Sequence, residues 1–308
     1  MTNLTNSNAI VTGGAGFIGS NLVETLSKES SVIVLDNLHT GSRDNISGPE
    51  KSGVQFLKKD AKNIGDIKEK ISCIYHLGSY SASPMYRENP HLVAEVIDGM
   101  ISVLELARKN DCPVVFSSTS SIYNGIKPPH REDIIPGVTD YYTEGRIEAE
   151  RLSELYCDLY GLNVSAMRFF SVYGYHEDSK HGYANLATQF MKAMMKEEQP
   201  VIYGDGTQRR DFVFVTDVVD ALLKASSSKG FEVYNVGSGI NYSLNELVDK
   251  INNLLGTKIS TKYIEMPVKN YVMETLADTN KASKKLGFRA KIDLDTGLRT
   301  LAKYYGAK

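Results

Sequence analysis

Features that would assign a protein to a specialised class are scarce in this 308-residue sequence. It contains three cysteines and no tryptophan. The cysteines lack the close spacing typical of metal ligands, and so low and odd a number argues against a disulfide framework. We therefore predict no metal site and a reducing compartment, the cytoplasm. Cys73 and Cys112 adjoin apolar runs, and we expect them to be core residues.

Charge of one sign and long hydrophobic runs are also lacking. Lys and Arg number 35 against 37 Asp and Glu, for a formal net charge of −2. This balance creates no broad attraction to nucleic acid or to an anionic membrane surface. No apolar run approaches the roughly 18 residues that span a bilayer, and the polar first residues do not resemble a signal peptide. We expect neither nucleic acid nor a membrane as a partner.

The most informative stretch present is residues 9–19, Ala-Ile-Val-Thr-Gly-Gly-Ala-Gly-Phe-Ile-Gly. A short β-branched run ends in glycines with the spacing Gly13-x-x-Gly16-x-x-Gly19, and an amphipathic pattern follows. Glycine permits positive φ and close approach of the backbone to a pyrophosphate. The helix that follows points its first N–H groups at that phosphate. The pattern predicts a strand–turn–helix unit that binds a dinucleotide.

A carboxylate closes the second apolar run, Val-Ile-Val-Leu-Asp. Asp36 lies 17 positions past Gly19 (36 minus 19), near the spacing at which an acid binds a ribose 2′-hydroxyl. Because such an acid repels a 2′-phosphate, we predict NAD rather than NADP as the cofactor.

Strand and helix patterns alternate through the first half of the chain. The predicted strands are residues 9–11, 32–35, 54–57, 73–77, 114–117 and 164–169, and the predicted helices are about 17–28, 91–109 and 141–160. This alternation predicts right-handed crossovers and a parallel sheet, and the near-continuous apolar strands predict a sheet covered on both faces. Ligands of such sheets bind beyond the carboxyl ends of the strands.

The second half is less regular. We predict helices near 183–196, 215–227, 243–255, 279–286 and 294–305, and strands near 200–203, 232–236 and 260–264. The resulting fold is α/β, a Rossmann-type doubly wound parallel sheet with a smaller, partly interleaved C-terminal lobe. Residues 1–170 would form the NAD-binding domain, to which about 211–237 return. Residues 171–308 would form mainly the substrate-binding lobe.

Three groups in the first half suggest proton and hydride chemistry. A hydroxyl-rich run, residues 117–121, ends one predicted strand, and Tyr142 and Arg146 lie one turn apart on one helix face. A free tyrosine has a pKa of about 10, so its use as a base near pH 7 requires lowering that pKa by roughly three units, about 4 kcal/mol. The nearby cation and an oxidised nicotinamide both favour the phenolate, and a strand-end hydroxyl can pass the proton.

Together these motifs resemble the extended short-chain dehydrogenase/reductases, and most closely the UDP-glucose 4-epimerase-like nucleotide-sugar epimerases. The resemblance runs nearly end to end. Its segments are Val-Thr-Gly-Gly-Ala-Gly-Phe-Ile-Gly-Ser-Asn-Leu (11–22), Asp-Asn-Leu (36–38), Tyr-His-Leu-Gly (75–78), Phe-Ser-Ser-Thr-Ser-Ser-Ile-Tyr (116–123), Arg-Phe-Phe-Ser-Val-Tyr-Gly (168–174), Tyr-Gly-Asp-Gly-Thr-Gln-Arg-Arg-Asp-Phe (203–212), Tyr-Asn-Val-Gly-Ser-Gly (234–239) and Ala-Asp (277–278).

Carried over by position, the resemblance implies Tyr142 as the catalytic base, Thr119 as its hydroxyl partner and Arg146 as the neighbouring cation. It implies an NAD site formed by Gly13, Gly16, Phe17, Ile18, Gly19, Asp36, Asn37, Asp60, Ala61, Leu77, Gly78, Ser79, Ser117, Tyr142 and Arg146. It implies a nucleotide-sugar site formed by Ser79, Thr119, Ser171, Asn185, Leu186, Tyr203, Arg210 and Lys269. Arg210 would clamp the diphosphate, because a planar guanidinium matches phosphate oxygens.

The sequence departs from the family pattern at five positions. It has Arg146 for the Lys of Tyr-x-x-x-Lys, Tyr141 for the preceding Pro, Ser171 for an Asn, Val96 for a frequent Asn near the cofactor, and Val268, beside Lys269, for a late Arg. These changes cluster around the cofactor and the sugar diphosphate. They bear on the catalytic rate and on the choice of sugar rather than on the fold.

The implied activity is NAD-dependent epimerisation of a UDP-sugar, UDP-glucose/UDP-galactose at C4, through a transient 4-keto intermediate. A dehydratase or decarboxylase of the same fold is one alternative, although Ser120 and Ser121 stand where those enzymes need an acid. A dehydrogenase acting on a small substrate, and a catalytically weak NAD- or nucleotide-sugar-binding protein, are others. The resemblance also implies a homodimer joined by a four-helix contact, with residues 91–109 and 141–160 as the candidate helices.

Overall fold

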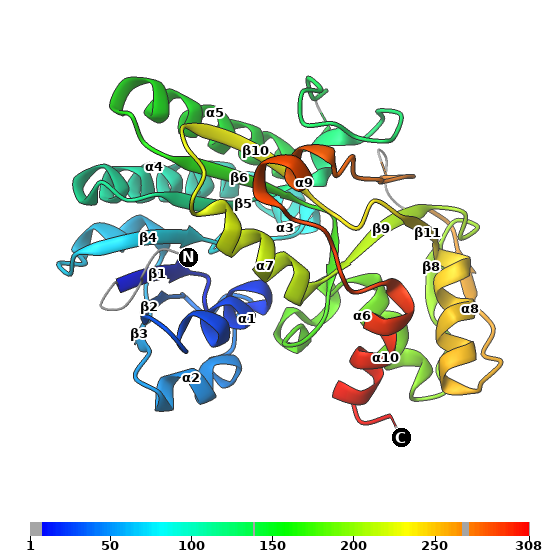
Figure 1. Cartoon of the computed structure of the whole chain (residues 1–308). Helices are drawn as coiled ribbons and strands as arrows, with labels where there is room; N and C mark the ends of the chain where they lie inside the picture. The colour runs from blue at the N-terminus through cyan, green and yellow to red at the C-terminus, as the bar shows by residue number, and fades with distance from the viewer. Residues whose placement is uncertain (1–7, 138, 267–270, 308) are drawn as a thin grey trace.

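The centre of the molecule is a seven-stranded parallel sheet (Figure 1). The computed structural model describes residues 8–137, 139–266 and 271–307. In spatial order the strands are β10 (Phe231–Val236), β6 (Val164–Phe169), β5 (Val114–Thr119), β4 (Ile71–His76), β1 (Asn8–Thr12), β2 (Ser31–Leu35) and β3 (Gln55–Leu57). The order runs outward in both directions from the β1–β4 pair, so the predicted doubly wound Rossmann-type fold is confirmed.

Two helical layers cover the sheet. α1 (Phe17–Leu26) and α7 (Val215–Ala225) pack on one face, and α4 (Leu92–Asn110) and α5 (Tyr141–Tyr160) pack on the other. Alternate side chains of β1 enter different cores: Val11 packs in the first and Ile10 in the second, and both are fully buried. Burial on both faces explains why these strands are apolar at nearly every position.

The ends of α5 are set by local chemistry. The Asp140 side chain accepts the N–H of Thr143 at 2.9 Å and caps the first turn. Gly161, with φ of 70°, ends the helix in the left-handed conformation that glycine adopts without steric cost. Because the cap directly precedes Tyr141–Tyr160, it places the second and sixth helical residues, Tyr142 and Arg146, at the edge of the sheet.

The second half builds smaller elements beside the sheet, to the right in Figure 1. β11 (Asn241–Ser243), β9 (Arg209–Phe214) and β7 (Ser171–Tyr173) form a three-stranded sheet, and β12 (Lys262–Ile264) pairs with β8 (Val201–Tyr203).

The remaining helices of the whole described chain are α2 (Ser47–Lys51), α3 (Ser83–Glu88), α6 (Leu186–Met194), α8 (Leu244–Leu255), α9 (Asn280–Leu286) and α10 (Leu294–Tyr304). Short 3-10 turns are η1 (Arg43–Ile46), η2 (Ala61–Asp66), η3 (Ser120–Tyr123) and η4 (Asp178–Tyr183).

Each predicted strand and helix has a counterpart, but β7, β9, β11, α2 and α3 were not predicted. All five have only three to six residues, too few for a periodicity of two or 3.6 to stand out. β9 begins with two arginines, which hid its buried end, Asp211–Phe214. The division into two lobes stays a prediction. The structure shows that β10 is the edge strand of the large sheet and that α7 packs against α1.

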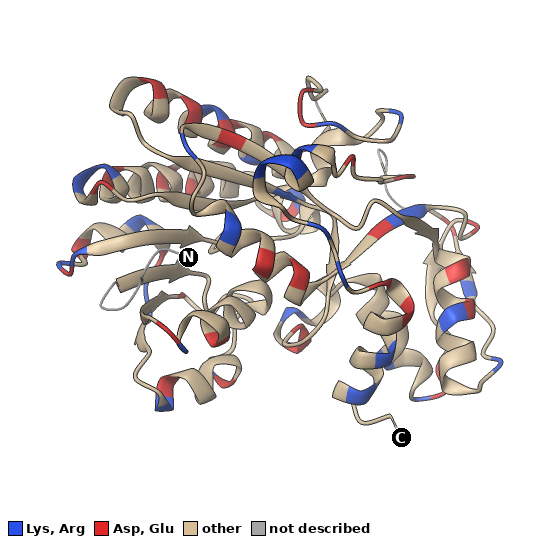
Figure 2. Ribbon diagram, in the orientation of Figure 1, with Lys and Arg blue, Asp and Glu red and all other residues tan. Residues whose placement is uncertain are grey.

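Charged residues of both signs are spread over the molecule (Figure 2), as expected from the near-equal numbers of acidic and basic residues. Figure 2 shows acidic and basic residues interspersed along the elements. In the described part of the chain, no helix has both the length and the apolar character needed to span a bilayer.

Candidate active site

A cavity of about 610 Å³ lies at the carboxyl ends of β1, β2, β4 and β5. Its wall includes residues directly after each of these strands, and also residues of η4, β8 and β9. This is the crevice at which doubly wound sheets bind ligands, where the strand order changes direction.

The glycine turn forms one wall of this cavity by close backbone approach. Gly13 has φ of 67°, and a Cβ there would lie 2.6 Å from Cα of Gly78. A Cβ on Gly19 would lie 2.0 Å from the carbonyl oxygen of Gly13. α1 begins after Gly16, which caps it with no side-chain hydrogen bond. The first turn of α1 therefore presents backbone N–H groups at the cavity, an arrangement that suits an anion.

Asp36 lies at the cavity wall after β2 and is only 7% exposed. Its two carboxylate oxygens accept the N–H groups of Ala15 at 3.0 Å and Leu38 at 2.7 Å. Burial raises the pKa of Asp36, and these amides act in the opposite direction. Beside it, the Asn37 amide donates to the Asp60 carboxylate at 2.7 Å. This corner offers oxygen acceptors to a ribose.

His76 and Thr12 tie the ends of β4 and β1 together. The Thr12 hydroxyl oxygen accepts the N–H of Gly78 at 3.0 Å, and the same hydroxyl forms a hydrogen bond with Nδ1 of His76 at 2.7 Å. Burial, and then the charge of Arg146, lower the pKa of His76 to about 3. The neutral imidazole thereby holds the turn at Gly78 against the glycine wall. In the sequence His76 stands out only as part of the Tyr-His-Leu-Gly motif, because its partner Thr12 lies 64 positions away.

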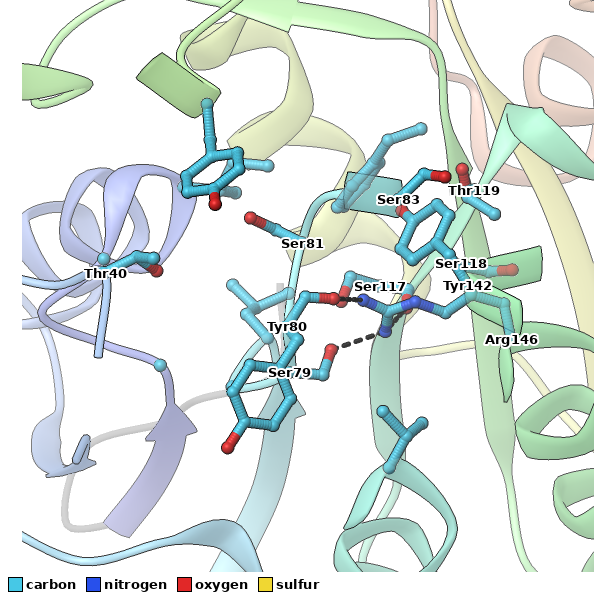
Figure 3. Close-up of a pocket in the computed structure, with 18 of the residues that line it drawn as sticks. Thr40, Ser79, Tyr80, Ser81, Ser83, Ser117, Ser118, Thr119, Tyr142 and Arg146 are labelled. Atoms are coloured by element: carbon cyan, nitrogen blue, oxygen red, sulfur yellow. Dashed lines mark hydrogen bonds between the residues drawn. The ribbon is translucent and has the colours of Figure 1, made fainter. Parts of the chain in front are cut away.

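Tyr142 and Arg146 share one face of α5, as the spacing predicts. Arg146 is 4% exposed, and its Cζ lies 5.2 Å from the centre of the Tyr142 ring. Its Nη1 donates to Ser79 Oγ at 2.5 Å and to the Ser117 carbonyl at 3.1 Å, and its Nη2 donates to the Tyr80 carbonyl at 2.9 Å (Figure 3). The guanidinium therefore bridges the carboxyl ends of β4 and β5.

No acid in the described part of the chain forms an ion pair with Arg146. All its hydrogen bonds within the described ranges go to a hydroxyl or to carbonyl oxygens, and its Nε is buried with no partner. A buried cation and an orphaned donor both cost free energy unless another group compensates them. The place beside Tyr142 therefore suits a ligand with negative charge or oxygen acceptors.

Thr119 ends β5 and is buried at the cavity wall. Its hydroxyl oxygen accepts the N–H of Ser121 at 3.1 Å, which leaves its proton available to donate. Behind it, Ser118 donates to Glu150 of α5 at 2.5 Å, and Glu150 forms a buried two-pronged ion pair with Arg168 of β6 at 2.7 and 3.0 Å. This network fixes the end of β5.

Two further cations, Arg210 and Lys180, line the cavity. Arg210 of β9 donates to the Arg209 carbonyl at 2.9 Å, and its Cζ lies 5.4 Å from the Tyr271 ring centre. Lys180 of η4 places Nζ 5.6 Å from the ring centre of Phe17, the first residue of α1. Burial lowers the pKa of Arg210 and of Lys180. Lys180 beside the N-terminus of α1, and Arg210 beside Tyr271, each give the cavity wall a positive charge that suits a phosphate.

The α6 end of the cavity is held by a buried acid. Asn185 caps α6 by accepting the Ala187 N–H at 3.0 Å. The N–H of Asn185 in turn donates to the fully buried carboxylate of Glu177 at 2.8 Å, which Thr188 also contacts. Burial raises the pKa of Glu177. The sequence carried no signal for Glu177, since a lone acid after a Tyr-Gly pair normally indicates a loop surface.

The structure brings nearly all predicted site residues to this one cavity. Those that line it are Gly13, Gly16, Phe17, Ile18, Gly19, Asp36, Asn37, Asp60, Ala61, Leu77, Gly78, Ser79, Ser117, Thr119, Tyr142, Arg146, Ser171, Asn185, Tyr203 and Arg210. Leu186 is not part of the wall, because it begins α6 and packs half-buried against the core. Lys269 and Val268 lie outside the described residues. Lining residues that the sequence analysis did not select include Lys180 and Arg87.

Metal chemistry has no candidate among the described residues. No group of three or more His, Cys, Asp or Glu side chains there is arranged to hold an ion. The three cysteines are buried thiols, and burial raises the pKa of Cys73 and Cys112 to about 12.

Sequence comparison places this arrangement among known proteins. A family model described as "NAD dependent epimerase/dehydratase family" matches residues 9–237. The chain is 34% identical over 306 residues to a putative UDP-glucose 4-epimerase of Methanocaldococcus jannaschii, covering 96% of this chain and 97% of that protein. It is 33% identical to the UDP-glucuronate 4-epimerase of Thermodesulfobacterium geofontis, with 94% and 93% covered. It is 28% identical to UDP-glucuronic acid decarboxylase 5 of Arabidopsis thaliana, with 95% and 87% covered.

Solved structures with the same fold bind nucleotide sugars. The UDP-N-acetylglucosamine 4-epimerase from Methanobrevibacter ruminantium M1, in complex with UDP-N-acetylmuramic acid, superposes with a TM-score of 0.92 at 28% identity, covering 98% of both chains. The UDP-glucose 4-epimerase of Thermotoga maritima with UDP-glucose gives 0.91 at 30% identity, covering 97% of this chain and 98% of that one. MoeE5 in complex with UDP-glucose and NAD gives 0.85 at 31% identity, covering 97% and 98%.

Proposed function

This chain belongs to the NAD-dependent epimerase/dehydratase family, and from that premise we propose that it epimerises a UDP-sugar at C4, with UDP-glucose and UDP-galactose as the first pair. The observation that carries the proposal is the half-buried Tyr142 beside the buried Arg146 at the end of β5, next to Thr119 and inside a dinucleotide crevice. A phenol, a cation and a hydroxyl in that place form a proton-transfer site.

The residues present fit NAD. The uncapped N-terminus of α1 and the nearby Lys180 suit its pyrophosphate, and Asp36 suits a ribose hydroxyl. The unpartnered Nε of Arg146 indicates a ligand at the other end of the crevice. When bound, NAD supplies a reversible hydride acceptor.

Tyr142 would do the proton chemistry. It accepts the proton of the sugar 4-hydroxyl as C4 loses its hydride, which leaves a 4-keto sugar. Thr119 donates a hydrogen bond to the same oxygen. After the keto sugar turns its other face to the crevice, Tyr142 returns the proton to that oxygen and C4 regains a hydride, so no net oxidation occurs. Throughout, Arg210 and the N-terminus of α6 would hold the diphosphate.

The residues that follow Thr119, and the engaged carboxylate of Asp140, favour an epimerase over a decarboxylase or dehydratase. Ser120 and Ser121 follow Thr119 and begin η3, so no carboxylate stands there. Asp140 also lines the cavity, but it already caps α5 and accepts a hydrogen bond from Ser83. Neither position offers a free acid for the extra elimination or proton-transfer step.

The cavity-lining side chains near Tyr142 would select the sugar. Ser81 and Ser83 give it neutral hydroxyls, which suit the unsubstituted glucose and galactose rings. Arg87, exposed at the end of α3, also lines the cavity and would suit a uronate carboxylate. UDP-glucuronate and UDP-galacturonate are therefore the second pair to test.

The deciding experiment follows turnover and cofactor together. Purified protein given UDP-galactose should form UDP-glucose with no net NADH, measured by chromatography and absorbance. Tyr142→Phe should lower kcat by roughly 10²–10⁴-fold while NAD stays bound, because only the proton-accepting oxygen is lost. Tyr141→Phe, on the exposed neighbouring tyrosine, is the matched control and should keep its activity.

Two results would contradict the proposal. An active Tyr142→Phe variant would remove Tyr142 as the base. A wild-type protein that binds NAD but turns over none of the UDP-glucose, UDP-glucuronate and UDP-N-acetylglucosamine pairs would instead be a nucleotide-binding protein. A keto-deoxy or decarboxylated product would point to the other reactions of the family.

A further inference from the structure

The hydroxyl of Ser79, which lines the crevice, points at the Arg146 guanidinium (Figure 3). Ser79 Oγ lies 2.5 Å from Arg146 Nη1 and accepts its hydrogen bond. Ser79 directly follows the Leu77–Gly78 turn at the end of β4, so its backbone is held by the contacts of Gly78 with Thr12 and Gly13. The hydroxyl is therefore presented from a rigid support.

An arginine at this position needs more acceptors than a lysine. A guanidinium carries five N–H donors in a fixed plane, whereas an ammonium carries three on a rotatable end. Here three acceptors meet the two Nη atoms: Ser79 Oγ, the Tyr80 carbonyl and the Ser117 carbonyl. The two carbonyls are backbone groups that any sequence supplies. Of the acceptors among the residues that the structure describes, Ser79 is the one that depends on a side chain.

Loss of that acceptor would free the guanidinium. Nη1 would keep only the Ser117 carbonyl at 3.1 Å, and one of its N–H groups would lose its acceptor, in addition to the unpartnered Nε. A planar fork with unsatisfied buried donors turns to find new partners. The positive charge would then leave its place 5.2 Å from the centre of the Tyr142 ring.

We propose that Ser79 is a positioning residue that holds the Arg146 guanidinium against Tyr142, and that this chain uses Ser79 together with Arg146 in place of the lysine of the Tyr-x-x-x-Lys motif. The inference rests on the proposed function and deepens it. In this proposal the Ser79 hydroxyl binds Arg146, whereas the family resemblance implies that Ser79 binds the cofactor and the substrate. The Oγ–H proton remains available to a ligand, so a cofactor contact is the competing role.

A double-mutant cycle separates the two roles. Ser79→Ala is made in the wild type and in Arg146→Lys, and kcat, the KM for the UDP-sugar and the Kd for NAD are measured for each. In the wild type we expect kcat to fall about 10-fold or more, with KM and Kd within about twofold. In Arg146→Lys the same substitution should cost about twofold, because an ammonium has only three N–H donors and the Tyr80 and Ser117 carbonyls together offer four lone pairs.

Further variants control for structure. Ser79→Thr keeps the hydroxyl and should retain most of the wild-type kcat. Ser72 lies on β4, the strand that precedes Ser79, and its hydroxyl donates to the Asn8 carbonyl at 3.1 Å, away from the cavity, so Ser72→Ala should leave kcat unchanged. If Ser79→Ala does not fold, Ser79→Cys replaces it, since a thiol fills similar space and accepts a hydrogen bond weakly.

Three outcomes would overturn the inference. Equal losses in both backgrounds would show that Ser79 acts independently of Arg146, and a weakened Kd for NAD with kcat intact would make it a cofactor ligand. The third readout needs no turnover: a crystal structure of Ser79→Ala with the guanidinium unmoved would also end the proposal. Failure of the proposed function is a separate result, seen as a wild type inactive on every UDP-sugar pair.

Discussion

Arg146 shows how one side chain changes what its neighbours must provide. Its relation to Tyr142 was predictable, because residues four apart on a helix always share a face. Its partners were not, because Ser79 and Ser117 lie 67 and 29 positions away on two different strand ends. The sequence therefore predicted the cation and its place beside Tyr142, while the structure identified what holds it.

His76 makes folding depend on pH. Its pKa is about 3 in the folded protein and about 6.5 in the unfolded chain, so the unfolded state alone takes up a proton between these values. The stability due to the neutral, buried ring is complete above pH 6.5 and is lost as the pH falls toward 3. Between pH 7 and pH 5 this residue should remove about 2 kcal/mol from the free energy of unfolding.

Urea denaturation of wild type and His76→Gln at both pH values measures this contribution. The variant should be less stable at pH 7 but should lose about 2 kcal/mol less than the wild type on acidification. His91→Gln, on an exposed histidine before α4, serves as the control and should follow the wild type. Identical acid losses in His76→Gln and the wild type would show that His76 is not the group responsible.

At the scale of the element, α5 carries a row of polar side chains on the face that meets the sheet. Tyr142, Arg146 and Glu150 follow at intervals of four, so successive turns meet the cavity, the strand ends and the buried Arg168. The predicted bounds of this helix, 141–160, match the observed ones, because Asp140 and Gly161 are strong local start and stop signals. β9 had no such signals and was missed.

The ion pair of Glu150 and Arg168 is costly to break from one side. Both side chains are buried, and Glu150 also accepts from Ser118. Glu150→Gln leaves the guanidinium without its charge partner, so the free energy of unfolding should fall by about 3–5 kcal/mol in urea denaturation at pH 7.

Glu154→Gln is the matched control for this prediction, because Glu154 lies one turn further along α5 and is exposed. It should change stability by less than about 0.5 kcal/mol. If Glu150→Gln proved as mild as Glu154→Gln, the buried pair would not contribute to holding the end of β5.

At the scale of the whole molecule, α4 and α5 present apolar side chains to solvent as well as to the sheet. The exposed ones are Ile101, Tyr141, Leu155, Leu159 and Tyr160. Because α4 and α5 pack against each other, their outer faces form one surface on which a second copy could complete a four-helix contact. We predict a homodimer formed through this surface.

Size measurement by analytical ultracentrifugation tests the dimer. A Leu155→Glu/Leu159→Glu variant should be a monomer, because four buried carboxylates per pair of chains would face one another across the contact. Ile135→Glu changes a more exposed apolar residue in a loop and should leave the dimer intact. A monomeric wild type, or a double variant that still pairs, would refute this surface.

The sequence by itself determined what is local: the glycine turn before α1, the acid after β2, the one-turn spacing of Tyr142 and Arg146, and the alternation that makes a parallel sheet. These follow from the periods of single strands and helices, which neighbouring residues set. Only the tertiary structure decided that Ser79 serves Arg146, that Lys180 approaches the start of α1, and that Leu186 turns to the core. Such contacts join distant segments, and they depend on how the layers pack.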